Sequence, residues 1–306
     1  MPGCPEPKPQ IESAQTPDTA RRFGGITRLY GDDGQARLAA AHVCVVGIGG
    51  VGSWAAEGLA RSGIGRLTLI DLDHVAESNI NRQIHASDAT LGQAKVEAMR
   101  ARILGYHPSC ALTLVDDFMT VENAAEQLSA GFDAVIDAID SLRAKVAMIA
   151  FCQRTGLPLV TCGAAGGQVD PTRIRVDDLA RTIQDPLLAK VRYELRKHHG
   201  FARDPKRRFG VEAVFSTEPL RYPYAGPPIG PPIGPPVGPP VGSPDGPPDR
   251  TRAGAACDLP PSGPAGLNCA GFGSVVTVTA CMGLFASARA INALAQYRTT
   301  TPRPAD

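Results

Sequence analysis

One βαβ unit in the first third of the chain constrains the fold more than any other feature. An apolar run at 42–46 (HVCVV) leads into the glycine-rich turn GIGGVG at 47–52, and a helix-like segment through Trp54 and Leu59 then leads to a second apolar run at 67–70. Strands that are apolar along their whole length are typical of a parallel sheet covered on both faces. The unit therefore predicts an α/β domain.

The same alternation of strand and helix continues through the chain. Apolar runs of strand length are separated by segments with helical periodicity, and this order predicts a doubly wound, Rossmann-like and mostly parallel sheet. The part after residue 170 is less regular. The expected strands are 111–115, 134–136, 157–161, 174–176 and 211–215, and the expected helices are 93–104, 121–128, 142–154 and 187–197.

Glycine and proline together divide the chain into segments. There are 33 Gly and 28 Pro, many of them in the repeat GPPIGPPIGPPVGPPVG, whose period of four residues excludes collagen. Such a repeat is typical of a solvated, polyproline-rich segment without a core. We therefore expect a disordered leader at 1–20, a main domain at 21–222, a disordered insertion at 223–266, an apolar helix at 267–297 that completes the domain, and a tail at 298–306.

The last apolar segment, 274–294, has the length of a membrane span. Its one charged side chain is Arg289, and Thr and Ser residues interrupt its apolar surface. A charge at mid-membrane is costly, so a helix buried in the domain is favoured over contact with a membrane.

Charge and cysteine usage exclude some classes of protein. Thirty-one Lys and Arg side chains against 30 Asp and Glu leave a formal net charge of +1, so no overall field favours nucleic acid or a membrane surface. The eight cysteines contain no CxxC pair, which disfavours a zinc site. The N-terminus lacks the order of a signal peptide, and we expect a protein of the reducing cytoplasm without zinc.

The glycine-rich turn predicts a nucleotide site. Gly47, Gly49, Gly50 and Gly52 lie between a strand and a helix, where free N–H groups and the helix dipole receive phosphate. Asp71 ends the next strand, near the usual position of the acid that binds a ribose hydroxyl. Together these residues favour an adenine nucleotide.

The segment that follows favours ATP over NAD. It crowds carboxylates, amides and an arginine beyond a strand end, more groups than hydride transfer requires. Arg82 and Lys95 are placed to neutralise phosphate charge, and Asn79 and Gln83 to orient oxygens. Asp140, after another strand, is placed to hold Mg²⁺. The alternative is that Arg82 and Asp140 form a structural ion pair and Lys95 is a solvated helix charge.

These motifs resemble the ATP-dependent adenylating enzymes related to ubiquitin-activating enzymes, MoeB and ThiF. The matching motifs are GIGGVG at 47–52, DLD at 71–73, SNINRQ at 78–83, GQAK at 92–95 and DAID at 137–140. The resemblance implies an ATP·Mg²⁺ site, adenylation of a carboxylate, release of pyrophosphate, and a homodimer. It also implies roles: ribose on Asp71 of the Asp71–Asp73 motif, phosphates on Asn79, Arg82 and Lys95, and magnesium on Asp140.

Further motifs are similar to one subgroup, which dehydrates N6-threonylcarbamoyladenosine in tRNA. They are RFGGITRLYG at 22–31, NRQIHA at 81–86, GGQVDPTRI at 166–174, TIQDPL at 182–187 and VFSTEP at 214–219. This resemblance implies cyclisation of the modified nucleoside through an acyl adenylate, with a sulfur-transfer protein as a candidate partner. An arginine that reaches the partner's site across a dimer is expected at Arg22 or Arg28.

A basic segment near residue 200 favours RNA as the substrate. Between 190 and 208 there are eight basic and two acidic side chains, which suits contacts with phosphates. The basic residues are Lys190, Arg192, Arg196, Lys197, Arg203, Lys206, Arg207 and Arg208. Cys162, His85 and His107 are interpreted as structural.

Three other functions remain open at this point. An activator of a ubiquitin-like sulfur-carrier protein shares the ATP site and is the main alternative. An NAD oxidoreductase shares only the glycine-rich turn and Asp71. A non-catalytic module would use the polyproline-like insertion to recruit a partner.

Overall fold

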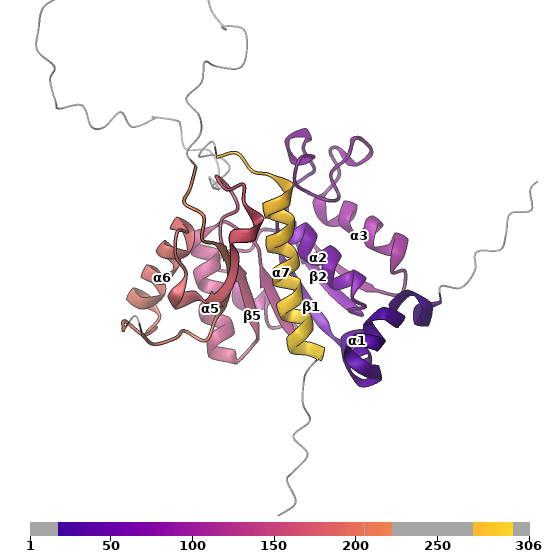
Figure 1. Cartoon of the computed structure of the whole chain (residues 1–306), viewed down its shortest axis with the longest axis horizontal. Coiled ribbons are helices and arrows are strands. Elements are labelled where there is room, and N and C mark those ends of the chain that lie inside the picture. Colours follow the sequence, from indigo (N-terminus) through magenta and orange to yellow (C-terminus); the bar gives the residue numbers. More distant parts are fainter. Residues whose placement is uncertain (1–17, 205, 222–271, 296–306) are drawn as a thin grey trace, which may run out of the picture.

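The computed structural model describes residues 18–204, 206–221 and 272–295, and these form one seven-stranded sheet with helices on both faces (Figure 1). The strand order is β3-β2-β1-β4-β5-β7-β6, and every neighbouring pair is parallel except β6 with β7. The strands are β1 (His42–Val46), β2 (Arg66–Ile70), β3 (Ala111–Val115), β4 (Ala134–Asp137), β5 (Leu159–Cys162), β6 (Ile174–Asp178) and β7 (Glu212–Ser216).

The helices are α1 (Thr19–Ala40), α2 (Gly52–Arg61), α3 (Lys95–Tyr106), α4 (Ala124–Gln127), α5 (Leu142–Thr155), α6 (Pro186–His198) and α7 (Val276–Ala295). The doubly wound fold predicted from the sequence is confirmed. The second half is more regular than expected, because β6 and β7 extend the same sheet.

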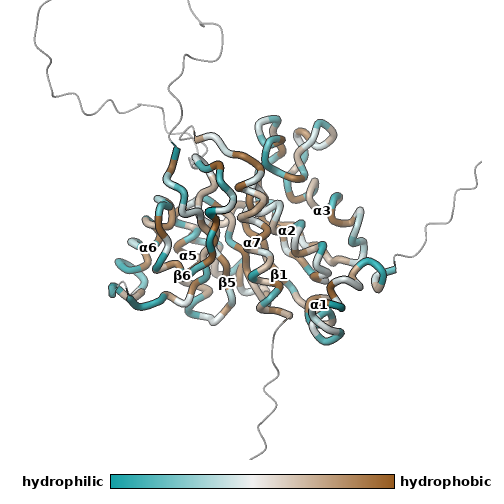
Figure 2. The backbone as a smooth tube through the Cα atoms, in the orientation of Figure 1, coloured by the Kyte–Doolittle hydropathy of each residue, from teal (hydrophilic) through white to brown (hydrophobic). Residues whose placement is uncertain are grey.

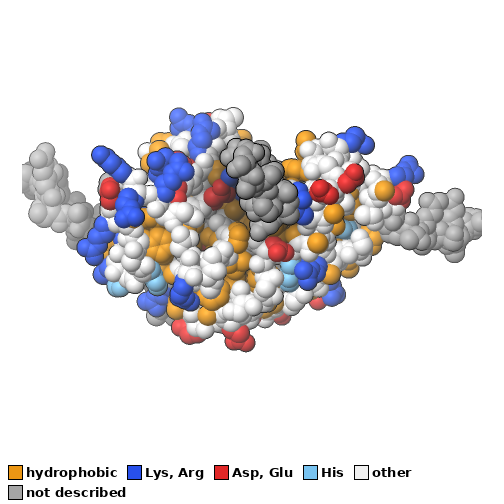
Figure 3. All heavy atoms as spheres, turned by 90° about the horizontal axis from the view of Figure 1, so that it is seen from below, with side chains coloured by type: hydrophobic (Ala, Val, Ile, Leu, Met, Phe, Trp, Pro, Cys, Tyr) orange, Lys and Arg blue, Asp and Glu red, His pale blue; other side chains and the backbone are white. Residues whose placement is uncertain are grey.

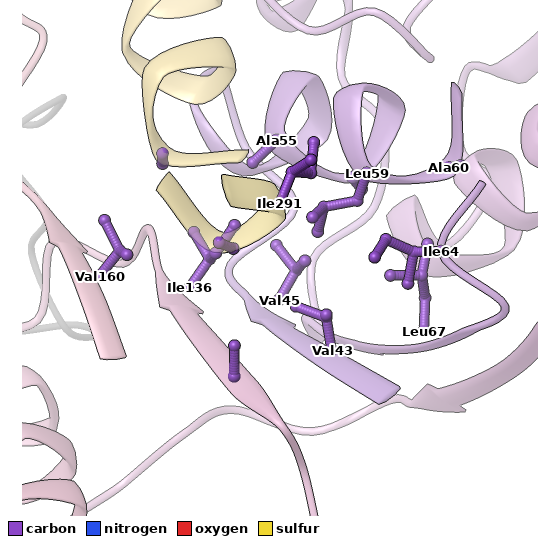
Figure 4. Packing of buried hydrophobic residues seen from close by; sticks show 14 of the residues in the cluster. Val43, Val45, Ala55, Leu59, Ala60, Ile64, Leu67, Ile136, Val160 and Ile291 are labelled. Carbon is purple, nitrogen blue, oxygen red and sulfur yellow. The ribbon is translucent and has the colours of Figure 1, made fainter. Parts of the chain in front are cut away.

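Alternating side chains of the strands fill two hydrophobic layers. Val43 and Val45 of β1 pack with residues of α2 and α7, including Leu59 and Ile291 (Figure 4). Cys44 and Val46 point to the opposite layer, which α4 and α5 cover. Hydrophobic segments lie at the centre of the molecule and hydrophilic segments around its periphery (Figure 2), as expected for a parallel sheet buried on both faces.

The last helix, α7, packs on the sheet beside α2 and α1 (Figure 1). By length and composition it is the one helix among the described residues that would fit a membrane span, yet half of its most apolar window is buried inside the protein. Arg289 lies on its exposed side, where its guanidinium pairs with the Glu212 carboxylate at 2.5 Å. The expectation of a packed helix agrees with this arrangement.

The first helix, α1, is absent from the expected elements. Asp18 caps it by accepting a hydrogen bond from the Arg21 N–H at 3.0 Å. Gly31 interrupts it with φ 74°, a conformation that glycine adopts at little cost. The helix begins at Thr19, so the end of the expected leader is helical. The expected insertion at 223–266 and tail at 298–306 lie outside the described residues.

Candidate nucleotide site

The glycine-rich turn joins β1 to α2 at the carboxyl edge of the sheet. Gly47 has φ 86°, and its N–H donates to the Ile70 carbonyl at 2.8 Å. A Cβ on Gly52 would lie 1.7 Å from the Gly47 carbonyl oxygen, so only glycine fits there. A Cβ on Gly49 would have no atom within 4 Å of it. The turn is therefore closed on the protein side at Gly52 and open at Gly49, where a phosphate is expected.

Asp71 ties this turn to the end of β2. One carboxylate oxygen accepts the Ile48 N–H at 2.6 Å, and the other accepts the Asp73 N–H at 2.8 Å. Burial raises the pKa of Asp71, while the nearby Lys95 ammonium and these two N–H groups act in the opposite direction. The carboxylate thus lies at the carboxyl ends of two adjacent strands, the place where doubly wound folds bind ligands.

Lys95 begins α3 and lies against the same carboxylates. Its Nζ is 2.6 Å from Asp73 Oδ2 and 3.9 Å from Asp71 Oδ1. The residue is only 6% exposed, so its interpretation as a solvated helix charge is wrong. The structure brings together one ammonium and two carboxylates at the mouth of the glycine-rich turn.

Arg82 lies over the turn from the other side. Its Cγ is 3.2 Å from the place of a Cβ on Gly50, and Nη1 donates to the Ser78 carbonyl at 2.6 Å. The Trp54 indole N–H of α2 donates to the Arg82 carbonyl at 3.0 Å. This arginine is therefore fixed by both its main chain and its guanidinium beside the predicted phosphate position.

The two predicted amides are buried in the same segment. Asn79 Oδ1 accepts the Ala76 N–H at 3.1 Å and so caps the short helix that leads to Arg82. Gln83 is buried, and its Oε1 has no hydrogen-bond partner. Asn79 thus shapes the segment, whereas Gln83 retains an acceptor that is not satisfied by the protein.

Asp140 follows β4 and is exposed at the carboxyl edge. The two residues before it, Ala138 and Ile139, pack directly on the glycine-rich turn, because a Cβ on Gly47 would lie 2.9 Å from Ile139 Cγ2 and 3.1 Å from the Ala138 carbonyl. No group of three or more His, Cys, Asp and Glu side chains among the described residues could hold a metal ion. A metal at Asp140 would therefore need ligands from a bound nucleotide.

Sequence reasoning missed a buried ionic group beneath this edge. Lys145 of α5 and Asp137 of β4 are fully buried, with Nζ 2.8 Å from Asp137 Oδ2. The Thr161 hydroxyl of β5 donates to the same oxygen at 2.7 Å. A signal was present, because Lys145 shares helical spacing with the apolar Ile149 and Cys152, which places it on the buried side of its helix.

Comparisons with known proteins identify this arrangement. The ThiF family matches residues 24–305. The chain belongs to the ThiF family. Within the family, it is 46% identical to the tRNA threonylcarbamoyladenosine dehydratase of Haemophilus influenzae, with 90% of this chain and 93% of that protein aligned. The crystal structure of the Escherichia coli tRNA N6-threonylcarbamoyladenosine dehydratase, TcdA, in complex with ATP is 45% identical, with a TM-score of 0.73 over 90% of this chain and 94% of that one.

Other members of the ThiF family match less of the chain. The Escherichia coli molybdopterin-synthase adenylyltransferase is 40% identical, but over 46% of this chain and 55% of its own length. The dehydratases named above align with nine-tenths of the chain, and this greater coverage favours the dehydratase prediction over the sulfur-carrier alternative.

The two arginines expected to reach across a ThiF-family dimer differ in their surroundings. The Arg22 guanidinium donates to the Tyr106 carbonyl at 2.8 Å and so anchors α1 to α3. Arg28, on the same helix, makes no hydrogen bond or ion pair within the described part of the chain. The geometry therefore assigns Arg22 a structural contact and leaves Arg28 available.

The basic segment consists of α6 and the loop that follows it, and its members fall into two groups. Arg192 is half-buried and donates to the Thr182 hydroxyl, and the Arg196 Nε donates to the Ala202 carbonyl at 3.2 Å. Lys and Arg side chains gather on the side of the molecule where α6 lies (Figure 3). The exposed members are Lys190, Lys197, Arg203, Lys206, Arg207 and Arg208.

The side chains interpreted as structural are buried. Cys162 is 1% exposed, and burial raises the pKa of its thiol to about 12, which disfavours a nucleophile. The His107 ring is 3.1 Å from the Ala60 carbonyl. His85 is buried, and neither of its ring nitrogens has a hydrogen-bond partner.

Proposed function

We propose that this protein is an ATP-dependent dehydratase that cyclises N6-threonylcarbamoyladenosine in tRNA. The observation that carries the proposal is the placement of Asp71, Arg82, Lys95 and Asp140 around one open glycine-rich turn, in a chain that matches dehydratases of this substrate over nine-tenths of its length.

The chemistry requires activation of a carboxylate, which is a poor electrophile. The threonyl carboxylate oxygen attacks the α-phosphorus of ATP, the bond to the β-phosphate breaks, and pyrophosphate leaves. The ureido group next to the resulting acyl adenylate then attacks its carbonyl carbon, and AMP leaves as the ring closes. The net change is the loss of one water from the nucleoside, so the protein has only to orient the reactants and stabilise charge.

The residues around the turn fit these needs. Asp71 lies where a ribose hydroxyl is bound in doubly wound folds, and Arg82 and Lys95 supply positive charge at the phosphates. Gly47, Gly49, Gly50 and Gly52 let the backbone approach them, while Gln83 offers an unpaired acceptor and Asp73 holds Lys95 in place.

Asp140 would hold Mg²⁺ together with the triphosphate. The fit rests on one exposed carboxylate next to the glycine-rich turn, because Mg²⁺ is commonly bound by one or two carboxylates plus phosphate oxygens and water. The ion would neutralise charge that develops on the pyrophosphate leaving group.

The six exposed basic residues of α6 and its loop form the proposed tRNA surface. The 13-residue helix is about 20 Å long and begins near the end of β5, so its basic end lies well away from the nucleotide site. A tRNA contacted there must extend across the molecule from the reacting nucleoside. Backbone contacts at that distance position the RNA without reading its sequence.

A homodimer is supported by the exposed side of α7. Leu284 and Phe285 are 44% and 41% exposed on the outer side of α7, whose other side packs on the sheet, and we place the dimer interface at these two apolar side chains. In such a dimer Arg28 is the arginine that reaches the partner's site. A cytoplasmic location and a sulfur-transfer protein partner stay predictions.

Mass spectrometry of nucleosides tests the proposed function. Modified tRNA is incubated with ATP and Mg²⁺, and we expect the adenosine derivative to lose one water while AMP forms in equal amount. Arg82→Ala should lower the rate by about 10²-fold or more, because it removes charge stabilisation at the phosphates. Arg100→Ala, on the exposed side of α3, is the control and should retain the rate. The proposal would be contradicted if the tRNA nucleoside kept its mass and the protein formed an adenylate only with a sulfur-carrier protein.

A further inference from the structure

Lys145 is the largest fully buried side chain of the described residues and is not used in the reaction above. Its ammonium donates to the Thr161 hydroxyl at 3.2 Å and to the Cys162 carbonyl at 2.9 Å, besides its ion pair with Asp137. Burial of a charged pair stabilises a fold little or not at all compared with apolar side chains of the same size. A role beyond packing is therefore indicated.

The contacts of Lys145 join two strand ends at the catalytic edge. Asp137 is the last residue of β4, and Cys162 is the last residue of β5. The Thr161 hydroxyl, which donates to the Asp137 carboxylate, closes the triangle of hydrogen bonds. One ammonium thus fixes the separation of β4 and β5 where both strands enter their loops.

Asp137 in turn shapes the loop that carries Asp140. Its second oxygen, Oδ1, accepts the Ile139 N–H at 3.3 Å. Ile139 and Ala138 are the residues that pack on Gly47, so any shift of this loop is felt by the glycine-rich turn. The contacts that start at Lys145 therefore lead to the loop that carries Asp140 and, through that loop, to Gly47 of the glycine-rich turn.

A second carboxylate shares the same ammonium. Asp185, which is 3% exposed, accepts the Ala164 N–H at 2.8 Å and the Leu188 N–H at 2.9 Å, and the positive charge of Lys145 acts against the rise that burial causes in its pKa. Removal of Lys145 alone would leave two buried carboxylates without their cation, so the single variant is expected to fold poorly.

We propose that Lys145 is a positioning residue for adenylation: through Asp137 it holds loop 138–140 against the glycine-rich turn, so that Asp140 faces the triphosphate. The proposal deepens the proposed function and rests on it for the reaction, although its effect on ATP binding is independent of the tRNA substrate.

The experiment replaces the ion pair by a neutral pair of similar shape, Asp137→Asn with Lys145→Met. The control removes a second ion pair, Glu57→Gln with Arg102→Met, in which Arg102 Nε lies 3.0 Å from Glu57 Oε2; Glu57 is buried and Arg102 is partly exposed. The dissociation constant of ATP with Mg²⁺ is measured by calorimetry without tRNA, and the melting temperature and the KM for tRNA are recorded beside it.

We expect the Asp137→Asn/Lys145→Met protein to bind ATP about tenfold more weakly and to form AMP about a hundredfold more slowly, with an unchanged KM for tRNA. The control should lose melting temperature and keep its ATP affinity within about twofold. ATP affinity and AMP formation within about twofold of the unaltered protein in the double variant would overturn the proposal.

Thr161→Val covers the case in which the double variant does not fold. It removes the hydrogen bonds of the Thr161 hydroxyl with Asp137 and with Lys145, and it keeps every charge. A rise of about threefold in the dissociation constant of ATP is expected, and an unchanged constant would overturn the proposal. If the unaltered protein binds ATP without forming the cyclic nucleoside, the proposed function fails, while the comparison of ATP affinities still decides the role of Lys145.

Discussion

At the scale of single residues, His85 has the most unusual environment. It is 4% exposed, and both ring nitrogens are buried without a hydrogen-bond partner. Burial lowers its pKa to about 4, and the positive charges of Lys95 and Arg102 act in the same direction. The ring is therefore neutral in the folded protein at neutral pH and must accept a proton only on unfolding in acid.

This environment predicts acid sensitivity above the range in which carboxylates titrate. Because the unfolded histidine binds a proton below its ordinary pKa of about 6.5 and the folded one does not until about 4, stability falls as the pH is lowered through this window, by up to about 3 kcal/mol. Urea unfolding at pH 7 and pH 5 measures the loss. His85→Met should show a smaller loss, and the exposed His74→Gln should behave as the unaltered protein. Equal losses in all three proteins would contradict this role of His85.

At the scale of the element, α6 combines an anchoring side with an exposed basic end. Leu187, Leu188, Val191 and Leu195 are buried against α5 and β7, and Arg192 is drawn into the same side by Thr182. Lys190 and Lys197 of the same helix are exposed, so the basic residues of one helix have different physical roles.

Variants of the two groups should therefore behave differently. A triple variant in which Gln replaces Lys206, Arg207 and Arg208 should bind tRNA about tenfold more weakly. Its binding constant should also depend less steeply on salt concentration in a log–log plot, because fewer counterions are released. Arg192→Gln should lower the melting temperature and leave the salt slope unchanged, because its guanidinium bonds to Thr182. Filter binding at several salt concentrations measures both, and an equal salt slope in all proteins would exclude this surface.

Most elements could be predicted because their apolar periodicity is strong. β1 and β3 have the predicted bounds, and no end of another strand differs from its predicted position by more than two residues. α1 was missed, since glycines at 24, 25, 31 and 34 and six charged residues hide its periodicity. In the site, motif spacing located Asp71, Arg82 and Lys95. The contacts of Lys145 with Thr161 and Cys162, in contrast, depend on β4 and β5 being neighbours, and local sequence does not contain that information.

At the scale of the whole molecule, α7 faces the core on one side and solvent with Leu284 and Phe285 on the other. Tyr30 of α1 donates its hydroxyl proton to Asn292 Oδ1 at 2.7 Å, so the helix that carries Arg28 is fixed to α7. A second copy that covers α7 would therefore also meet α1.

Two measurements test this assembly. Leu284→Glu with Phe285→Glu should yield a monomer in analytical ultracentrifugation, because two charges would be buried in the interface. If Arg28 acts in the partner's site, an equal mixture of inactive Arg28→Ala and Arg82→Ala proteins should recover about a quarter of the unaltered rate, through mixed dimers with one intact site. A mixture without activity would assign Arg28 no role across the interface.

The position of α7 in the chain has a consequence for synthesis. The Asn81 side-chain amide donates to the Ser274 carbonyl at 2.9 Å, and Thr279 lies beside both Gly50 and Arg82, so the segment that supports the arginine proposed to bind phosphate comes after residue 271. A nascent chain that has left the ribosome only as far as β7 has its complete sheet but an uncovered layer over β1 and β4. We therefore expect the support of Arg82, and with it adenylation, to be complete only once α7 has been translated.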